Sequence, residues 1–417
     1  MPGRRLLVLV LVAALASLQG CWLQVGFDAG HTRYNDLEDE LTTANVESLE
    51  EAWSADLLPS AAEPMVRGDR VYVTTGGFDP VSGSSAIDAR ALDTTSGVQA
   101  WSHRFVSFCC AAPALDYTSP TFVGAELWTG YLLIYSGPRP VGGIAAPVRL
   151  NPDNGATIAQ ESFVSVSPAV EVGSRVVQVQ VSTDLSRVLA VRDGTTLATE
   201  WTGALPGTTL PHPSRVAPAV ADGRVVDAEG NLLFGFPLEG CGAATCNATW
   251  TRDLGAPLST VVARSGSGEV LTIAGQDLVA LAPDTGETLW TAPLGAEAPG
   301  LAVTGDTIYV GAAATLRAFA AGGCGAATCE PTWTAPLGTS ATSSPVVAGG
   351  AVYVGGTGVV EVFPADGCGA ATCPSLTSVP VAGPVDHVVV DDGRLFAVSR
   401  PTASAARLTA LVPSDPA

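Results

Sequence analysis

The chain contains no lysine: all 20 basic side chains among its 417 residues are arginines, against 40 acidic side chains. This absence excludes a Schiff-base lysine, a P-loop lysine and a lysine-rich surface for nucleic acid. The formal net charge of −20 agrees, because a chain this acidic is repelled by phosphate backbones. We therefore expect no nucleic-acid partner.

Charged and aromatic residues are also scarce, at 14% and 6% of the chain, whereas Gly (46) and Pro (30) are abundant. This composition favours an all-β fold with many tight turns over a helical fold. Beyond the N-terminus, no apolar run approaches the ~18 residues that a membrane-spanning helix needs. The length permits either several domains or one large closed β architecture.

The N-terminus has the pattern of an export signal, with a pair of arginines before an apolar stretch that ends at Leu18. The following Leu18-Gln-Gly-Cys21 resembles the lipobox of bacterial lipoproteins, whose cysteine becomes the lipidated first residue of the mature chain. The resemblance implies removal of residues 1–20, lipidation of Cys21 and a location at the cell membrane or envelope. An ordinary secretory signal and twin-arginine export are the alternatives.

Two repeated units follow this signal. The first is a hairpin of alternating apolar residues around a Gly-Asp, Gly-Gly or Asp-Gly turn, which supplies the positive φ values of a tight hairpin. Its copies lie at residues 66–73, 303–310 and 347–354, with looser copies at Asp222-Gly223 and Asp392-Gly393.

The second unit follows each hairpin and ends in tryptophan. The end positions 53, 101, 159, 201, 250, 290, 333 and 376 are spaced like four-stranded propeller blades, about 40 to 58 residues apart. Ala159 and Leu376 replace the tryptophan in two copies. We therefore predict an all-β, eight-bladed propeller, whose tryptophans are Trp53, Trp101, Trp201, Trp250, Trp290 and Trp333.

Trp53 has no hairpin before it, whereas the last repeat has no fourth strand of its own. The segment around residues 51–55 can supply that strand, which closes the ring and leaves no free sheet edge. The predicted divisions of the chain are a signal peptide (1–20), an anchor and lead-in segment (21–44), the propeller (45–413) and a tail (414–417).

The Leu-Asp-x-x-Ser/Thr-Gly-x-x-x-Trp unit resembles the repeat of PQQ-like (quinoprotein-like) β-propellers, over nearly the whole chain. Residues 22–53 resemble the N-terminal segment of the bacterial members. The resemblance implies the fold strongly and the chemistry weakly, because most proteins with these repeats hold no quinone. It also implies that the six tryptophans pack between adjacent blades. Looser contacts are expected at Ala159 and Leu376.

Three copies of Cys-Gly-Ala-Ala-Thr-Cys lie between the third and fourth strands of their repeats. Thiolates in separate blades are rotated apart and do not converge on a metal, so we predict a disulfide within each copy. Each pair closes a short loop and gives modest stabilisation. The pairs are Cys241–Cys246, Cys324–Cys329 and Cys368–Cys373.

Cys109 and Cys110 are adjacent, in the connection between the first two blades. Quinoprotein alcohol dehydrogenases carry a vicinal disulfide in a similar place, against the quinone, so the resemblance implies a quinone-facing position for this pair. The likeness stops there, because Ala-Ala-Pro-Ala replaces the polar segment of those enzymes and no lysine exists to contact a quinone. We expect an inert vicinal disulfide and no cofactor, with PQQ and Ca²⁺ as the alternative.

Nothing else in the sequence points to catalysis or to a metal. Four histidines are scattered, no Gly-x-Ser-x-Gly elbow occurs, and the acidic residues, Asp391-Asp392 among them, lack EF-hand spacing and suggest a solvated surface. We predict a non-catalytic, lipid-anchored envelope propeller that binds a protein, peptide or glycan partner as a scaffold. The alternatives are a PQQ/Ca-dependent quinoprotein dehydrogenase and a sugar- or polymer-binding module.

Overall fold

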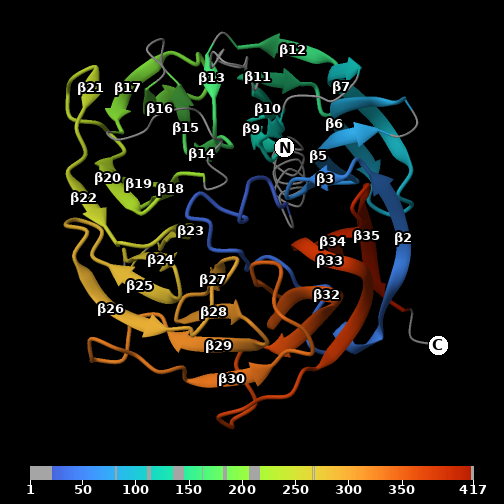
Figure 1. Ribbon diagram of the computed structural model, residues 1–417, viewed down its shortest axis with the longest axis vertical. Coiled ribbons are helices and arrows are strands. Elements are labelled where there is room, and N and C mark those ends of the chain that lie inside the picture. The colour runs from blue at the N-terminus through green and yellow to red at the C-terminus, as the bar shows by residue number, and fades with distance from the viewer. Residues whose placement is uncertain are drawn as a thin grey trace, which may run out of the picture.

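The computed structural model describes residues 21–79, 82–109, 114–134, 145–161, 163–181, 186–205, 217–264, 266 and 268–414. Apart from the short 3-10 turn η2 (Val46–Ser48), the regular elements among these residues are β-strands, which form seven sheets. Figure 1 shows the sheets standing around a common centre, with β14, β18, β23 and β27 among the innermost strands. In the described part of the chain, no helix has the length and apolarity to span a bilayer.

Six sheets follow one another along the chain and are numbered here in that order. Sheet 1 contains β3 (Ser60–Ala61), β4 (Met65–Arg67), β5 (Arg70–Asp79), β6 (Ser84–Asp93) and β7 (Gln99–Cys109). Sheet 2 contains β8 (Ala114–Tyr117), β9 (Thr121–Val123), β10 (Glu126–Ile134), β11 (Ala145–Leu150) and β12 (Thr157–Gln160). Sheet 3 contains β13 (Val164–Ser165), β14 (Val170–Val172), β15 (Arg175–Val181), β16 (Arg187–Asp193), β17 (Thr199–Ala204) and β21 (Thr245–Cys246).

The next three sheets have four strands each. Sheet 4 contains β18 (Ala219–Ala221), β19 (Arg224–Glu229), β20 (Leu232–Pro237) and β22 (Trp250–Asp253). Sheet 5 contains β23 (Leu258–Ala263), β24 (Val270–Ala274), β25 (Asp277–Leu281) and β26 (Thr288–Pro293). Sheet 6 contains β27 (Leu301–Val303), β28 (Thr307–Ala312), β29 (Thr315–Ala320) and β30 (Trp333–Pro336).

The seventh sheet joins the two ends of the chain. Its strand order is β1 (Tyr34–Asn35), β31 (Val346–Ala348), β32 (Ala351–Pro364), β33 (Thr377–Asp391), β34 (Arg394–Thr402), β35 (Ala405–Pro413) and β2 (Leu49–Leu57). The outer strand β2 pairs antiparallel with β35, with Trp53 opposite Ala410 and Ala55 opposite Leu408. An N-terminal strand therefore lies beside the last strand of the chain, where the sequence predicted the missing fourth strand.

The predicted hairpins are formed as β4–β5, β27–β28 and β31–β32, and the looser copies are formed as β18–β19 and β33–β34, each between an innermost strand and the next strand outward. We call the turns of these hairpins the inner turns, and the face of the disc that carries them the inner-turn face. Gly349 in one inner turn has a φ of 54°, and a Cβ there would lie 1.9 Å from the carbonyl oxygen of Leu41. Only glycine fits this position.

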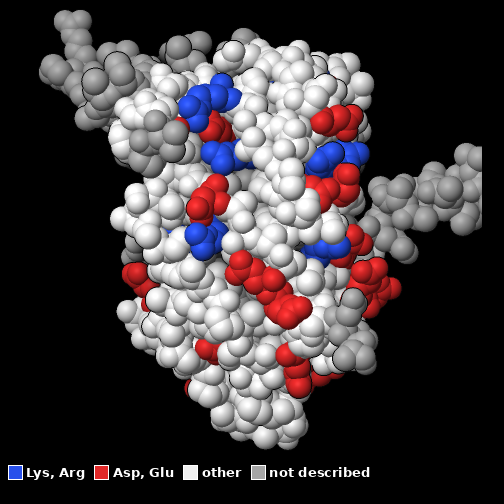
Figure 2. All heavy atoms as spheres, turned by 90° about the vertical axis from the view of Figure 1, so that its right-hand side faces the viewer, with Lys and Arg blue, Asp and Glu red and all other residues white. Residues whose placement is uncertain are grey.

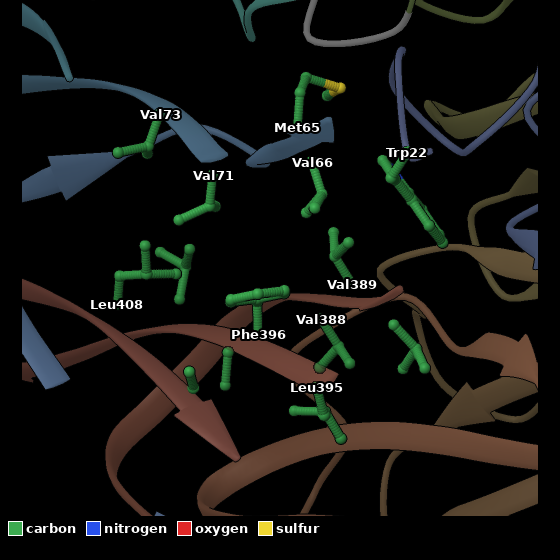
Figure 3. Close-up of a cluster of buried hydrophobic side chains, with 14 of the residues drawn as sticks. Trp22, Met65, Val66, Val71, Val73, Val388, Val389, Leu395, Phe396 and Leu408 are labelled. Carbon is green, nitrogen blue, oxygen red and sulfur yellow. The ribbon is translucent and has the colours of Figure 1, made fainter. Parts of the chain in front are cut away.

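The largest hydrophobic cluster lies where the chain ends meet. Figure 3 shows Trp22 and side chains of β4 and β5 packed against side chains of β33, β34 and β35. Trp22, Met65 and Phe396 in this cluster are fully buried. Burying a large apolar side chain contributes roughly 1.5–3 kcal/mol, so the cluster stabilises contacts between segments more than 300 residues apart.

Candidate functional site

Residues 22–35, which we call the axial segment, run through the middle of the ring (Figure 1). Its carbonyl oxygens accept backbone hydrogen bonds from innermost strands in chain order. The bonds run from Val66 to Trp22 (2.9 Å), Phe122 to Leu23 (2.8 Å), Val220 to Ala29 (2.6 Å), Ala263 to Gly30 (2.9 Å), Val303 to Thr32 (2.9 Å) and Val347 to Arg33 (2.9 Å).

Two side chains complete this series of contacts. The Gln24 amide oxygen accepts a bond from the Glu171 N–H at 3.2 Å, and the Asn35 amide donates to the Val390 carbonyl at 2.9 Å. The partners lie in β4, β9, β14, β18, β23, β27, β31 and β33, so the segment bonds to each sheet in turn. Gly30 packs so closely that a Cβ would lie 2.2 Å from the Ala263 carbonyl oxygen.

A buried carboxylate, Glu63, organises the centre of the ring. It accepts bonds from the Trp22 indole N–H at 3.1 Å and the Gly26 backbone N–H at 2.8 Å. The Arg33 guanidinium lies 2.8 Å from its other oxygen, and the His387 Nδ1 lies 3.9 Å away. Glu63 is 2% exposed, so water screens this ion pair only weakly and the attraction between the two charges is stronger than at the surface.

Electrostatics set the charge states in this cluster. Burial alone would raise the pKa of Glu63, but Arg33, His387 and the Gly26 N–H outweigh it and lower the pKa below its ordinary value. Burial lowers the pKa of His31 to about 4, and the charge of Arg33 adds to the effect. Near neutral pH, Glu63 is therefore ionised and His31 is neutral, with no hydrogen-bond partner for its Nε2 among the described residues.

The sequence analysis missed this cluster, although one signal was present. A proline recurs just before or within the innermost strand of the repeats, and a small residue precedes it at Ser119, Ser167, Ala217, Ala256, Ala298, Ser344 and Gly383. Glu63 takes that place in sheet 1. A carboxylate at a position otherwise reserved for small residues indicates a buried partner, which here is Arg33.

Asp391 is the last residue of β33, the strand that also carries His387. Its burial corrects the expectation that the acidic residues are exposed to solvent. The sequence suggested a solvated acidic surface, but the Asp391 side chain is 1% exposed. One oxygen accepts a bond from the Asn35 amide at 3.4 Å, and the other has no partner in the described structure. Burial, with the charges of Glu38 and Asp392, raises the pKa of Asp391 to about 9.

At the rim, the three Cys-Gly-Ala-Ala-Thr-Cys hexapeptides contain the predicted disulfides, Cys241–Cys246, Cys324–Cys329 and Cys368–Cys373. Each hexapeptide also bonds to the outer strand of the preceding sheet. Thr202, Thr291 and Thr334, each directly after a tryptophan, donate to the second alanine of the hexapeptide at 2.9 Å. Each disulfide loop is therefore a clamp between neighbouring repeats.

The repeat tryptophans lie against glycines of the following sheet. A Cβ at the facing glycine would come within 3.0 Å of the indole ring in each of six pairs: Trp53–Gly97, Trp101–Gly155, Trp201–Gly240, Trp250–Gly286, Trp290–Gly323 and Trp333–Gly367. Four of the indoles also donate to a carbonyl of that sheet at 2.7–3.0 Å. Because the facing glycine has no side chain, the indole ring can pack directly against the backbone of the following sheet.

The junction between sheets 2 and 3 differs, because Ala159 replaces the tryptophan. Leu197 takes the place of the facing glycine, at a φ of 60°, and packs against Trp128 and its apolar neighbours. A cavity of about 10 Å³, room for about one water molecule, lies in this junction beside Thr129 and Gln178. The Gln178 amide oxygen has no partner among the described residues.

The predicted quinone-facing pair lies only partly within the described residues. Cys109 ends β7, opposite Ser84 of β6, whereas Cys110 lies outside them. The nearby Arg104 is already paired with Asp88 at 2.7 Å and Asp79 at 3.5 Å. The described residues contain no group of three or more His, Cys, Asp or Glu side chains able to hold a metal ion.

Comparisons with known proteins agree with this architecture. The sequence model of a family described as outer membrane protein assembly factor BamB matches residues 274–368. No curated protein matches the sequence. Among solved structures, BamB from Moraxella catarrhalis superposes with a TM-score of 0.55 at 18% identity, covering 88% of this chain and 99% of that chain.

Two enzymes share the same architecture. A europium-containing methanol dehydrogenase superposes with a TM-score of 0.63 at 10% identity, covering 96% of this chain and 99% of the enzyme. The quinohemoprotein alcohol dehydrogenase ADHIIG from Pseudomonas putida HK5 gives 0.62 at 13% identity, with coverages of 97% and 82%. Identities this low show a shared fold and leave the chemistry open.

The radial sheets and the central segment define an all-β propeller. Quinoprotein and BamB structures share this fold, and the match of residues 274–368 to the BamB family model agrees with the resemblance of the tryptophan-ended units to PQQ-like (quinoprotein-like) repeats.

Proposed function

We propose that this protein is a non-catalytic, lipid-anchored propeller of the cell envelope that serves as a binding or scaffold module for a protein, peptide or glycan. In this proposal residues 1–20 are a signal peptide, Cys21 is lipidated, and residues 45–413 form a closed ring of eight blades. The axial segment carries the proposal, because its bonds to eight successive innermost strands make the disc a rigid body.

The alternative, a PQQ- and Ca²⁺-dependent dehydrogenase, requires residues that fit an anionic quinone and a divalent cation. Arg33, at the centre of the ring, is paired with Glu63, and Arg104, the arginine nearest to Cys109 in the sequence, is paired with Asp88. Burying anionic carboxylates without free cations costs several kcal/mol. These two pairings support the proposal of no quinone site, and the segment that follows Cys109 lies outside the described residues.

A partner-binding role is tested by recovering the full-length protein, with a C-terminal affinity tag, from detergent-solubilised envelopes. The expected result is one partner that co-purifies in constant ratio through a second, size-based separation. A sample passed over the column after the tag is cleaved serves as the control. Recovery of the propeller alone, under conditions that preserve other envelope complexes, would contradict the scaffold role.

The enzymatic alternative is tested by incubating the purified protein with PQQ and Ca²⁺. Binding is measured by calorimetry, and turnover of alcohols and sugars is measured with an artificial electron acceptor. We expect neither stoichiometric binding nor turnover. Stoichiometric quinone binding with turnover that is lost in Cys109→Ser would replace the scaffold proposal with the oxidoreductase.

Lipidation is tested by growth with a labelled fatty acid. The wild type is expected to carry the label and to sediment with membranes, and Cys21→Ser is expected to do neither. A serine variant that remains labelled and membrane-bound would remove the anchor from the proposal.

A further inference from the structure

No flexible linker separates Cys21 from the folded propeller. The next residue, Trp22, is fully buried, its carbonyl accepts a bond from the Val66 N–H at 2.9 Å, and its indole donates to Glu63 at 3.1 Å. Cys21 itself is half-buried and carries a free thiol. An acyl group on this sulfur would therefore be separated from the folded disc by one residue.

The position of Cys21 is central and on one face. Burial raises the pKa of the Cys21 thiol, and the residues near enough to act on that pKa are Asp391, Gly68, Arg67 and Asp392. Gly68 and Asp392 belong to the inner turns of the first and last repeats. The anchor therefore leaves the disc near its axis, on the inner-turn face.

The surface beside Cys21 contains an exposed apolar side chain. Leu37 is 50% exposed, and its N–H bonds to Asn35, which contacts Asp391. The next residue, Glu38, accepts a bond from the Gly393 N–H of an inner turn at 3.2 Å. Exposed acids flank Leu37 on the same stretch, namely Asp36, Asp39 and Glu40.

We propose that the inner-turn face lies flat on a lipid bilayer and that the opposite face points away from it. This inference rests on the lipid anchor proposed above. Two acyl chains hold a protein at a membrane durably, and an attachment at the axis with no flexible linker leaves the disc little freedom to stand on its rim. Leu37 reaches the interface beside the anchor.

The negative charges on the inner-turn face determine which lipid headgroups it can approach. The exposed acids next to Leu37 repel anionic headgroups, whose surface attracts cationic segments and disfavours anionic ones. The fitting surface is therefore rich in zwitterionic lipid. Partners reach the opposite face and the rim, because the bilayer covers the inner turns.

The absence of lysine makes the orientation measurable, because a single introduced lysine is the only side-chain amine. Asp306 and Ala314 are both exposed and flank the two ends of β28, Asp306 in an inner turn and Ala314 on the opposite face. A six-residue strand separates these ends by roughly 20 Å. Asp306→Lys and Ala314→Lys are therefore a matched pair.

Each lipidated variant is labelled with an amine-reactive fluorophore and placed in phosphatidylcholine vesicles that contain a lipid-attached contact quencher. The lysine-free parent gives the background from the terminal amine. We expect at least threefold stronger quenching at position 306 than at position 314, and weaker quenching at 306 when half of the lipid is phosphatidylglycerol. A Gly/Ser insertion of about ten residues between Cys21 and Trp22 should abolish the difference between the two positions.

Fatty-acid labelling of the same samples separates the two proposals. Variants without label overturn the lipid anchor itself. Labelled variants that are quenched equally at both positions, or more strongly at 314, overturn the flat orientation and leave the anchor intact.

Discussion

The rim and the axis of this propeller join the same sheets by different chemistry. At the rim, each contact repeats: a tryptophan lies on a glycine of the next sheet, and three disulfide loops clamp neighbouring repeats. At the axis, one unrepeated segment bonds to all the innermost strands and buries charged groups such as Glu63 and Arg33. The rim contacts can be predicted from the sequence because they repeat. The axial contacts occur only once, so no repeated pattern reveals them.

The rim also shows how the repeat tolerates an exception. At the junction of sheets 2 and 3, the ring and the facing glycine are both replaced, by Ala159 and Leu197. The larger side chain now belongs to sheet 3 and the smaller one to sheet 2, so the summed side-chain volume at this contact is roughly preserved. Leu197, however, adopts a left-handed backbone conformation that is costly for a residue with a Cβ. The small cavity in the same junction is lined by other residues, among them Thr129 and Gln178.

Also at the rim, charged groups meet in exposed pairs. Figure 2 shows arginines lying beside carboxylates on the rim that carries β2, with no basic patch on that face. Arg407 and Asp56 pair at 2.9 Å, with 35% and 67% of their side chains exposed. Exposed pairs contribute little, about 0–1 kcal/mol, whereas a buried charge that loses its partner is costly.

The largest expected effect comes from breaking the axial ion pair. Arg33→Met should lower the free energy of unfolding by about 3–5 kcal/mol, because Glu63 is left charged and buried. The matched rim variant, Arg407→Met, should lower it by less than about 1 kcal/mol. Urea unfolding followed by tryptophan fluorescence measures both. Equal effects would show that the axis and rim do not differ in this respect.

The next effect is a pH dependence at the axis. Asp391 keeps its proton to about pH 9 in the folded protein and ionises near 3.8 when unfolded, so the folded state binds more protons between these values. Its contribution to stability is complete below pH 3.8 and is lost as the pH rises toward 9.

Asp391→Asn mimics the protonated acid and should remove this dependence. Relative to wild type, the variant should gain about 2–4 kcal/mol in unfolding free energy between pH 5 and 8, since one proton corresponds to about 1.4 kcal/mol per pH unit. Urea midpoints at both pH values give the comparison. A difference between the two proteins that does not change with pH would mean that Asp391 is ionised in the fold.

A smaller effect is expected from a rim clamp. Replacing Cys324 and Cys329 by serine should cost about 2 kcal/mol, because the disulfide closes only a short loop. A reductant should shift the wild-type unfolding midpoint in the same direction and leave the Asp391→Asn pH effect unchanged. Stability that is insensitive to both treatments would show that the hexapeptide bonds to Thr291 hold the clamp without the disulfide.

The smallest effect tests the exceptional junction. Ala159→Trp alone should destabilise by about 1–2 kcal/mol, because the ring meets Leu197 in place of glycine. Adding Leu197→Gly should recover part of the loss and give a coupling energy of at least about 0.5 kcal/mol in a double-mutant cycle. Strictly additive effects would show that these two positions do not face each other.

Much of the rim was predictable because its determinants are local and repeated. The same holds nearer the axis for the hairpins at 66–73, 303–310 and 347–354, which follow from apolar alternation around Gly-containing turns. The disulfides follow from the separation of five positions between the two cysteines of each hexapeptide, which places their Cα atoms 5.5–5.7 Å apart in one turn. The pairing of β2 with β35 also followed, because the last repeat lacked a strand and Trp53 lacked a hairpin.

The axial cluster was decided by the tertiary structure. No local pattern pairs Glu63 with Arg33 and His387, because the ring must first form before these residues, separated by up to 354 positions, meet at its centre. The same holds for Asp391, which by sequence is one of two adjacent acids near a turn, yet is buried while its neighbour Asp392 stays exposed. Composition and repeats determined the strands, the rim contacts and the fold class, since these depend on residues near in sequence. The charge states at the axis and the central position of Cys21 arise only when eight innermost strands surround one segment and exclude water from it.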